Sequence, residues 1–132
     1  MSRQVLGEIY REMRRIFVYT TDKKQYKRLD DWRVPELSED GKLRDDCDGF
    51  ITYAHKLIRE QLPDKEEVKM YPVYCKTSTG GHVVLAIEYA NNTYIFDNRQ
   101  TRIVTFDFLK RRDYSDFRRP KGSVSGKWYK MF

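Results

Sequence analysis

Residues 45–62 read DDCDGFITYAHKLIREQL and give the clearest helical signal in the chain. Its apolar side chains recur at steps of three and four residues, at Phe50, Ile51, Ala54, Leu57, Ile58 and Leu62. That period is typical of one face of an amphipathic helix, and Pro63 ends the pattern. Asp45 or Asp46 is a suitable N-cap. We therefore predict a helix whose first turn carries Cys47 on the face that meets the core.

The segments around this helix predict an α+β domain. Residues 3–18 have apolar side chains at helical spacing and predict a first helix, whereas the composition of residues 19–46 predicts turns and loop. After Pro63 the pattern becomes that of strands, expected at Val68–Lys76, His82–Ile87, Thr93–Asp97, Arg102–Phe108 and within Ser123–Tyr129. The strand His82–Ile87 is apolar on both faces, as a central strand should be. We expect the strands to form an antiparallel meander.

The length and composition predict one folded domain. The chain has 132 residues and a mass of 16.0 kDa, so we expect residues 1–132 to form a single unit. Charged residues make up 35% of the chain, a share that leans towards disorder. Ten Tyr, seven Phe and two Trp argue for a packed core instead, because disordered chains contain few aromatic residues.

Neither a membrane span nor a secretion signal is visible. No apolar run approaches the roughly 18 residues that a membrane-spanning helix needs. Residues 1–15 contain four arginines and no continuous apolar stretch. The two cysteines, Cys47 and Cys75, form neither a disulfide framework nor a zinc motif. We therefore expect no membrane partner and a cytoplasmic location.

The positive charge is concentrated at the end of the chain. Residues 109–132 hold eight basic and two acidic side chains, which accounts for the whole net charge of +6. Tyr114, Phe117, Trp128 and Tyr129 lie between the basic residues. This region is a candidate nucleic-acid surface. Basic side chains lying over aromatic rings on a solvated surface explain the same pattern, and no nucleic-acid-binding motif accompanies it.

Three residue types that thiol catalysis needs fall where the predicted elements begin or end. Cys47 opens a helix, whose N-terminal N–H groups and dipole stabilise a thiolate. His82 opens the central strand after Gly80-Gly81, and Asp97 ends the next strand. The hairpin through Asn91-Asn92 lets His82 and Asp97 reach one end of the sheet. A thiol, an imidazole base and a carboxylate that orients the base are the parts of a catalytic triad.

Each of these residues also has a structural interpretation. A cysteine on an apolar helix face is often a small core residue. A histidine near the start of a strand is often a hydrogen-bonded structural residue, and Asp97 is a suitable turn cap. Asp45, Asp46 and Asp48 surround Cys47, and nearby carboxylates raise the pKa of a thiol. The residues alone leave the catalytic and the structural interpretations open.

An ordered set of motifs resembles the bacterial transglutaminase-like cysteine proteinases, a branch of the papain/transglutaminase-type thiol enzymes. The matching stretches are Asp31-Trp32, Pro35-Glu36-Leu37, Asp45 to Ile51, Gly81 to Leu85, Phe96 to Arg99, and Trp128. In the family these places hold a Trp, a Pro-x-Glu-like stretch, Gly-Asp-Cys-Glu-Asp-Tyr-Ala, His-Ala-Val-Leu, Leu-Asp-Asn and a late Trp. The matches cover residues 26–128, in the same order and with similar gaps.

The resemblance implies a papain/transglutaminase-like fold, with the catalytic helix packed on an antiparallel sheet. It implies a Cys47–His82–Asp97 triad that cleaves a peptide or related amide bond through a thioacyl-enzyme. The backbone N–H of Cys47 would be one oxyanion donor, and the loop at Asp31 and Trp32 is the candidate for lining the site and supplying another. Trp32 is equally suited to be a core anchor.

The resemblance also bears on calcium and on context. No cofactor is required for this chemistry, but some family members depend on calcium held by acidic residues beside the cysteine, which makes Asp46 and Asp48 candidate ligands here. Asp45 stands where the family has glycine, and Gly49 stands where it has a second acidic residue. The chain is short for the family and resembles a phage or prophage member, acting in a host cytoplasm or carried in a virion.

Three functions remain as hypotheses at this point. The first is a cysteine peptidase or amide hydrolase acting on a protein or peptide substrate. The second is a non-catalytic binding module on the same scaffold, whose basic residues 109–132 contact nucleic acid or an acidic protein. The third is acyl transfer to an amine, which the same triad can perform when the site excludes water.

Overall fold

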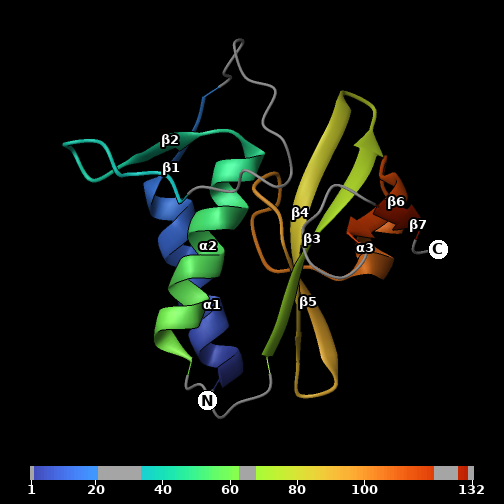
Figure 1. Ribbon diagram of the computed structural model, residues 1–132, viewed down its shortest axis with the longest axis horizontal. Coiled ribbons are helices and arrows are strands. Elements are labelled where there is room, and N and C mark those ends of the chain that lie inside the picture. Colours follow the sequence, from blue (N-terminus) through green and yellow to red (C-terminus); the bar gives the residue numbers. More distant parts are fainter. Residues whose placement is uncertain (1, 21–33, 63–67, 121–127, 131–132) are drawn as a thin grey trace.

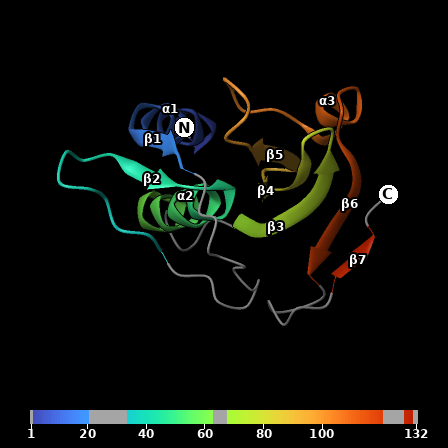
Figure 2. The same ribbon diagram turned by 90° about the horizontal axis from the view of Figure 1, so that it is seen from above.

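The computed structural model describes residues 2–20, 34–62, 68–120 and 128–130. Its main elements are two long helices on one side of a five-stranded sheet, with a short third helix on the other side (Figures 1 and 2). The helices are α1 (Ser2–Ile16), α2 (Cys47–Gln61) and α3 (Phe106–Lys110). The sheet contains β3 (Val68–Thr77), β4 (Gly80–Tyr89), β5 (Asn92–Phe96), β6 (Ser115–Pro120) and β7 (Trp128–Lys130).

The two long helices form where the sequence predicts them. In α2, the Asp46 carboxylate accepts a hydrogen bond from the Gly49 N–H and so acts as the N-cap. The apolar stripe of α2 is buried, including Phe50, Ile51 and Ala54. In α1 the buried face is formed by Leu6, Ile9, Tyr10, Met13 and Ile16. The helix α1 ends at Ile16, two residues before the expected end.

The sheet divides the core into two layers. Its strand order is β5-β4-β3-β6-β7, and every neighbouring pair is antiparallel. In the central strand β4, Val83, Leu85 and Ile87 pack with the two long helices. Val84 and Ala86 face the opposite layer, which contains residues of α3 and β6. The predicted burial of both faces of this strand is confirmed.

The predicted meander is correct only from β3 to β5. The strand β6, which was not predicted, crosses back to pair with the outer edge of β3. The expected strand at Arg102–Phe108 is wrong: Val104 makes one isolated bridge with Ile95, and Phe106 already lies in α3. Thr105 caps α3 by accepting a hydrogen bond from the Phe108 N–H, and this local capping signal outweighs the strand-like alternation.

Three short strands, β1, β2 and β7, lie outside the central part of the fold. Within residues 19–46, Leu43–Asp45 forms β2, which pairs in parallel with β1 (Phe17–Tyr19). Three-residue strands are too short to show an alternating pattern, so the sequence predicted neither. Of the strand expected within Ser123–Tyr129, the structure describes Trp128 and Tyr129, which lie in β7; residues 121–127 lie outside the described part of the chain. In the described residues, no helix is long and apolar enough to span a membrane.

Candidate active site

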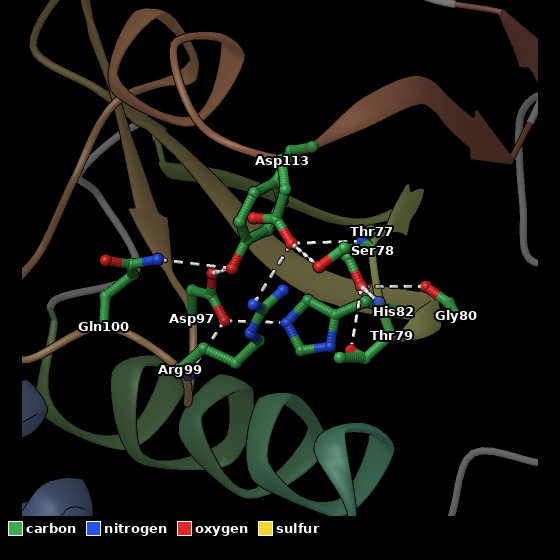
Figure 3. Close-up of polar contacts among 10 residues, drawn as sticks. Thr77, Ser78, Thr79, Gly80, His82, Asp97, Arg99, Gln100 and Asp113 are labelled. Carbon is green, nitrogen blue, oxygen red and sulfur yellow. Dashed lines mark hydrogen bonds and ion pairs between the residues drawn. The ribbon is translucent and has the colours of Figure 1, made fainter.

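The structure brings His82 and Asp97 together at one end of the sheet. The pairing of Leu85 with Phe96 places the end of β5 beside the beginning of β4, so Asp97 lies next to His82 (Figure 3). The distance from His82 Nε2 to Asp97 Oδ1 is 2.7 Å. His82 is 7% exposed and Asp97 is fully buried, so this contact is shielded from water.

Hydrogen bonds keep the Asp97 carboxylate ionised. Burial raises its pKa, but the bonds to His82 and Tyr114 and the N–H of Arg99 lower it more, so the pKa lies below its ordinary value. An ionised carboxylate only accepts hydrogen bonds, so the shared proton sits on His82 Nε2. This tautomer leaves the lone pair of His82 Nδ1 free to act as a base.

Two tyrosines hold Asp97 from opposite directions, and the sequence predicted neither contact. The hydroxyl of Tyr114 donates to Asp97 Oδ2 at 2.5 Å. The hydroxyl of Tyr10, on α1, lies 2.6 Å from the backbone carbonyls of both Asp97 and Gln100 and donates to one at a time. Burial raises the pKa of both tyrosines above the ordinary value, so both remain neutral donors.

A polar network connects this pair to the turn before His82. Asp113 accepts hydrogen bonds from the N–H and the hydroxyl of Ser78, which lies in the turn between β3 and β4. Arg99 Nη2 lies 3.4 Å from the same carboxylate, and its guanidinium lies 5.0 Å from the centre of the Tyr114 ring. Figure 3 shows Arg99 and Asp113 between Asp97 and this turn. No local sequence signal marks these residues, because their contacts are tertiary.

Cys47 is the first residue of α2 and lies beside the strand that carries His82. Its side chain is half-buried and packs against the core layer under the helices. The backbone N–H of Val83, the residue after His82, contacts the thiol and lowers its pKa. No hydrogen bond joins Cys47 to His82 among the described residues. Catalytic hydrogen bonds are often long before substrate binds and tighten when it does.

The environment of Cys47 favours the neutral thiol. Burial is the largest cause that raises its pKa, to about 12, and the charges of Asp48 and Asp46 raise it further. The backbone N–H groups near the sulfur lower the pKa by less than these causes raise it. The carboxylates therefore act as predicted from the sequence, although Asp46 also serves as the helix cap. The thiol needs a base to remove its proton before or during attack.

Asp45 and Gly49, the two residues that depart from the family pattern, lie against each other. A β-carbon at Gly49 would collide with the carboxyl group of Asp45, so position 49 has no room for a side chain while Asp45 lies there. Asp45 Oδ1 also accepts a hydrogen bond from the Asp46 N–H at 2.7 Å. The carboxyl group of Asp45 therefore occupies the space that a side chain at position 49 would need.

The remaining residues discussed from the sequence are Asp31, Trp32 and Cys75. Asp31 and Trp32 lie outside the described residues. Cys75, which has no histidine near it in the sequence, lies directly opposite His82 in the β3–β4 pair. Its thiol is fully buried, and burial followed by Asp97 raises its pKa to about 12. Cys75 is therefore shielded from reagents by burial and not by distance from a histidine.

A search of solved structures found a similar fold. The calcium-bound form of Legionella pneumophila LapG matches with a TM-score of 0.65 and 19% sequence identity, covering 97% of this chain and 68% of that chain. The predicted architecture, a helix packed on an antiparallel sheet, is thereby confirmed. No curated protein matches the chain.

The family comparison covers nearly the whole chain. The profile of the bacterial transglutaminase-like cysteine proteinases matches residues 2–131. The match includes the helix that begins at Cys47, the strand that carries His82, and Asp97 directly after β5. The resemblance seen in the sequence is therefore confirmed, and with it the class of enzyme. The chain belongs to the family of bacterial transglutaminase-like cysteine proteinases.

Proposed function

We propose that Cys47, His82 and Asp97 form a catalytic triad that hydrolyses a peptide or related amide bond in a protein substrate. The observation that carries this proposal is the buried 2.7 Å contact between His82 Nε2 and Asp97 Oδ1, on the strand whose Val83 N–H contacts the Cys47 thiol. Family membership supports the same chemistry, because these enzymes are cysteine proteinases.

The first half-reaction transfers the acyl group to sulfur. His82 Nδ1 takes the proton from the Cys47 thiol as the sulfur attacks the carbonyl carbon. The backbone N–H of Cys47 lies in the first turn of α2, where N–H groups have no partner within the helix, and it donates to the oxygen that becomes negative. The C–N bond then breaks, and His82 gives the proton to the departing amine, which leaves a thioester on Cys47.

The second half-reaction releases the acid. His82 Nδ1 takes a proton from water, the hydroxide oxygen attacks the thioester carbonyl, and the C–S bond breaks. The proton returns to the Cys47 sulfur and the thiol is restored. Asp97 keeps the His82 ring in one tautomer and stabilises the imidazolium that exists between these steps.

The test combines turnover with labelling of the two thiols. We expect the protein to cleave a fluorescent casein and Cys47→Ala and His82→Ala to abolish cleavage. Iodoacetamide should label Cys47 faster than the fully buried Cys75, and His82→Ala should slow the labelling of Cys47 while Cys75 stays slow in both proteins. Equal, slow labelling of both thiols in the native protein would overturn the triad. If a primary amine added to the assay becomes joined to the acyl product, where hydrolysis would give a free acid, the reaction is acyl transfer.

We propose that catalysis needs no calcium. Asp46 and Asp48 were the predicted ligands, but the Asp46 carboxylate is engaged as the helix cap. Within residues 2–20, 34–62, 68–120 and 128–130, no group of three or more His, Cys, Asp or Glu side chains could hold a metal ion. The described residues therefore contain no such cluster for a calcium ion like the one in LapG, and no step here passes through a metal.

In the described part of residues 109–132, arginine side chains pack on aromatic rings and pair with a carboxylate. The Arg112 guanidinium lies 4.4 Å from the centre of the Phe108 ring, and that of Arg119 lies 3.6 Å from the Tyr71 ring centre. Arg118 pairs with Asp116 at 2.9 Å. This packing fits the solvated-surface interpretation, and the comparisons do not support nucleic-acid binding.

A further inference from the structure

A cleft separate from the triad lies between α1 and residues 101–105. It has a volume of about 360 Å³, within the range of small-molecule sites. One wall is the face of α1 that carries Arg3, Leu6 and Arg11, and the opposite wall carries Arg102 and Ile103. The cleft is therefore lined by three arginine residues together with apolar side chains, and the Arg102 guanidinium also lies 5.9 Å from the centre of the Phe108 ring outside it.

The three arginines have no counter-charge in the cleft. No carboxylate lines it. Among the described residues, none of the three forms an ion pair. Arg11 Nη1 lies 3.7 Å from the position that a β-carbon on Gly7 would take, so its guanidinium folds along α1 towards the cleft. Charges of one sign around a low-dielectric cleft focus the field there and attract ions of the opposite sign.

The helix that forms one wall adds to the positive potential. Acidic residues usually occupy the first turn of a helix, where they balance the positive end of the dipole. The first turn of α1 has no acidic residue and contains Arg3 instead. A positive side chain near the positive end of the helix dipole is unfavourable, and an anion bound beside it would offset this repulsion.

We propose that this cleft binds an organic phosphate. Guanidinium groups bind phosphate through paired N–H donors, and a polyvalent phosphate matches three positive charges better than a single carboxylate does. Thr101 and Thr105 add hydroxyl donors at the rim, and Leu6, Ile103 and Tyr94 offer apolar surface to the organic part. A nucleotide-sized ligand has both features.

The cleft touches the segment that carries Asp97. Tyr10 lines the cleft, and its hydroxyl bonds to the carbonyls of Asp97 and Gln100. A ligand that spans α1 and residues 101–105 therefore stabilises the protein against unfolding, because it binds only the folded arrangement. This proposal does not depend on the triad, and binding can be measured without turnover.

The experiment uses ADP and inorganic pyrophosphate as probes. We expect both to raise the melting temperature and to bind in calorimetry, with ADP binding at least tenfold more tightly because of the apolar side chains of the cleft. The variant Arg3→Gln/Arg11→Gln/Arg102→Gln should lose at least tenfold in affinity for both. A control of equal charge, Arg15→Gln/Arg59→Gln/Arg111→Gln, removes exposed arginines outside the cleft and should bind as the wild type does.

Three results would overturn the proposal. The wild type could fail to bind either probe at millimolar concentration, or the control could lose as much affinity as the cleft variant, which would indicate diffuse attraction to a basic chain. Equal affinity for ADP and pyrophosphate would remove the organic part of the assignment. If the triple variant is unfolded by circular dichroism, the three single variants replace it, each expected to lose about threefold or more.

Discussion

Tyr114 donates its hydroxyl hydrogen to Oδ2 of Asp97, while Oδ1 of the same carboxylate meets His82. The ring of Tyr114 also meets that of His82 edge-on, at 6.0 Å between centroids. Tyr114 thus contacts both His82, the proposed general base, and Asp97, the carboxylate that orients it. It is a positioning residue: it acts through Asp97 and its ring packing, and it fixes which oxygen faces the imidazole.

Tyr114→Phe should lower kcat by roughly tenfold or more and leave KM nearly unchanged, because this hydroxyl is buried and bonded to Asp97. Loss of a hydrogen bond to a buried carboxylate should also lower the free energy of unfolding by about 1–3 kcal/mol. The bond lowers the pKa of Asp97, so its removal raises that pKa. Activity that requires ionised Asp97 should then be lost at a higher pH as the solution is acidified.

Tyr10→Phe is the matched control for this prediction. It removes a hydroxyl that bonds to the backbone of the same segment and not to the carboxylate. We expect a similar loss of stability and an unchanged acid limb in the pH profile of kcat/KM. An acid limb that stays in place in Tyr114→Phe as well would show that Tyr114 has only a structural role.

Asp97→Asn should lower kcat by a factor on the order of 10³–10⁴, because the amide favours the wrong tautomer of His82. The wild-type carboxylate has a depressed pKa, so its contribution to stability is present above the unfolded pKa and is lost as the pH falls through the folded one. Denaturant unfolding from pH 6 down to acid conditions should therefore be less steeply pH-dependent in Asp97→Asn. Full activity in this variant would exclude Asp97 from the triad.

Alkylation of Cys47 should increase steeply with pH. Its pKa of about 12 means that the reactive thiolate increases by about tenfold per pH unit between pH 7 and 10. Asp48→Asn removes a nearby negative charge and should raise the rate at a fixed pH. Cys75 in the same molecule is the control, since its thiol is fully buried. A rate that is flat above pH 7 would mean that Cys47 is already ionised, contrary to this prediction.

Gly49→Ala should destabilise the protein by about 1–3 kcal/mol, because the new methyl group collides with the Asp45 carboxyl group. In an Asp45→Gly background the same change should cost much less, since the obstructing group is gone. Urea unfolding of the four proteins in this double-mutant cycle measures the coupling. Equal costs in both backgrounds would mean that the two positions do not interact.

Removal of calcium should leave casein cleavage and the melting temperature unchanged. Among the described residues, no group of three or more His, Cys, Asp or Glu side chains could hold a metal ion, and the Asp46 carboxylate already caps α2. The measurement compares protein in EGTA with protein in excess calcium. Activity that disappears in EGTA and returns with calcium would contradict the expectation, and Asp48→Asn would then test whether that side chain is a ligand.

Features that depend on local periodicity could be predicted from the amino-acid sequence. The three- and four-residue spacing in residues 50–62 defines α2 and places Cys47 in its first turn, because side chains that recur at this period share one helix face. Continuous apolar residues in β4 predict a strand that is buried on both faces. One hairpin was enough to place His82 and Asp97 at the same end of the sheet, since a tight turn leaves little freedom of register.

The groups that complete the site could not be predicted, because tertiary packing brings them together. Tyr114 and Tyr10 reach Asp97 across 17 and 87 residues of chain, and nothing in the local pattern of either tyrosine indicates this. The crossing of β6 to the edge of β3 brings Tyr114 there, and the packing of α1 brings Tyr10. Such contacts arise when separate segments bury their apolar faces together, so they depend on the whole chain and not on the order of residues within any one segment.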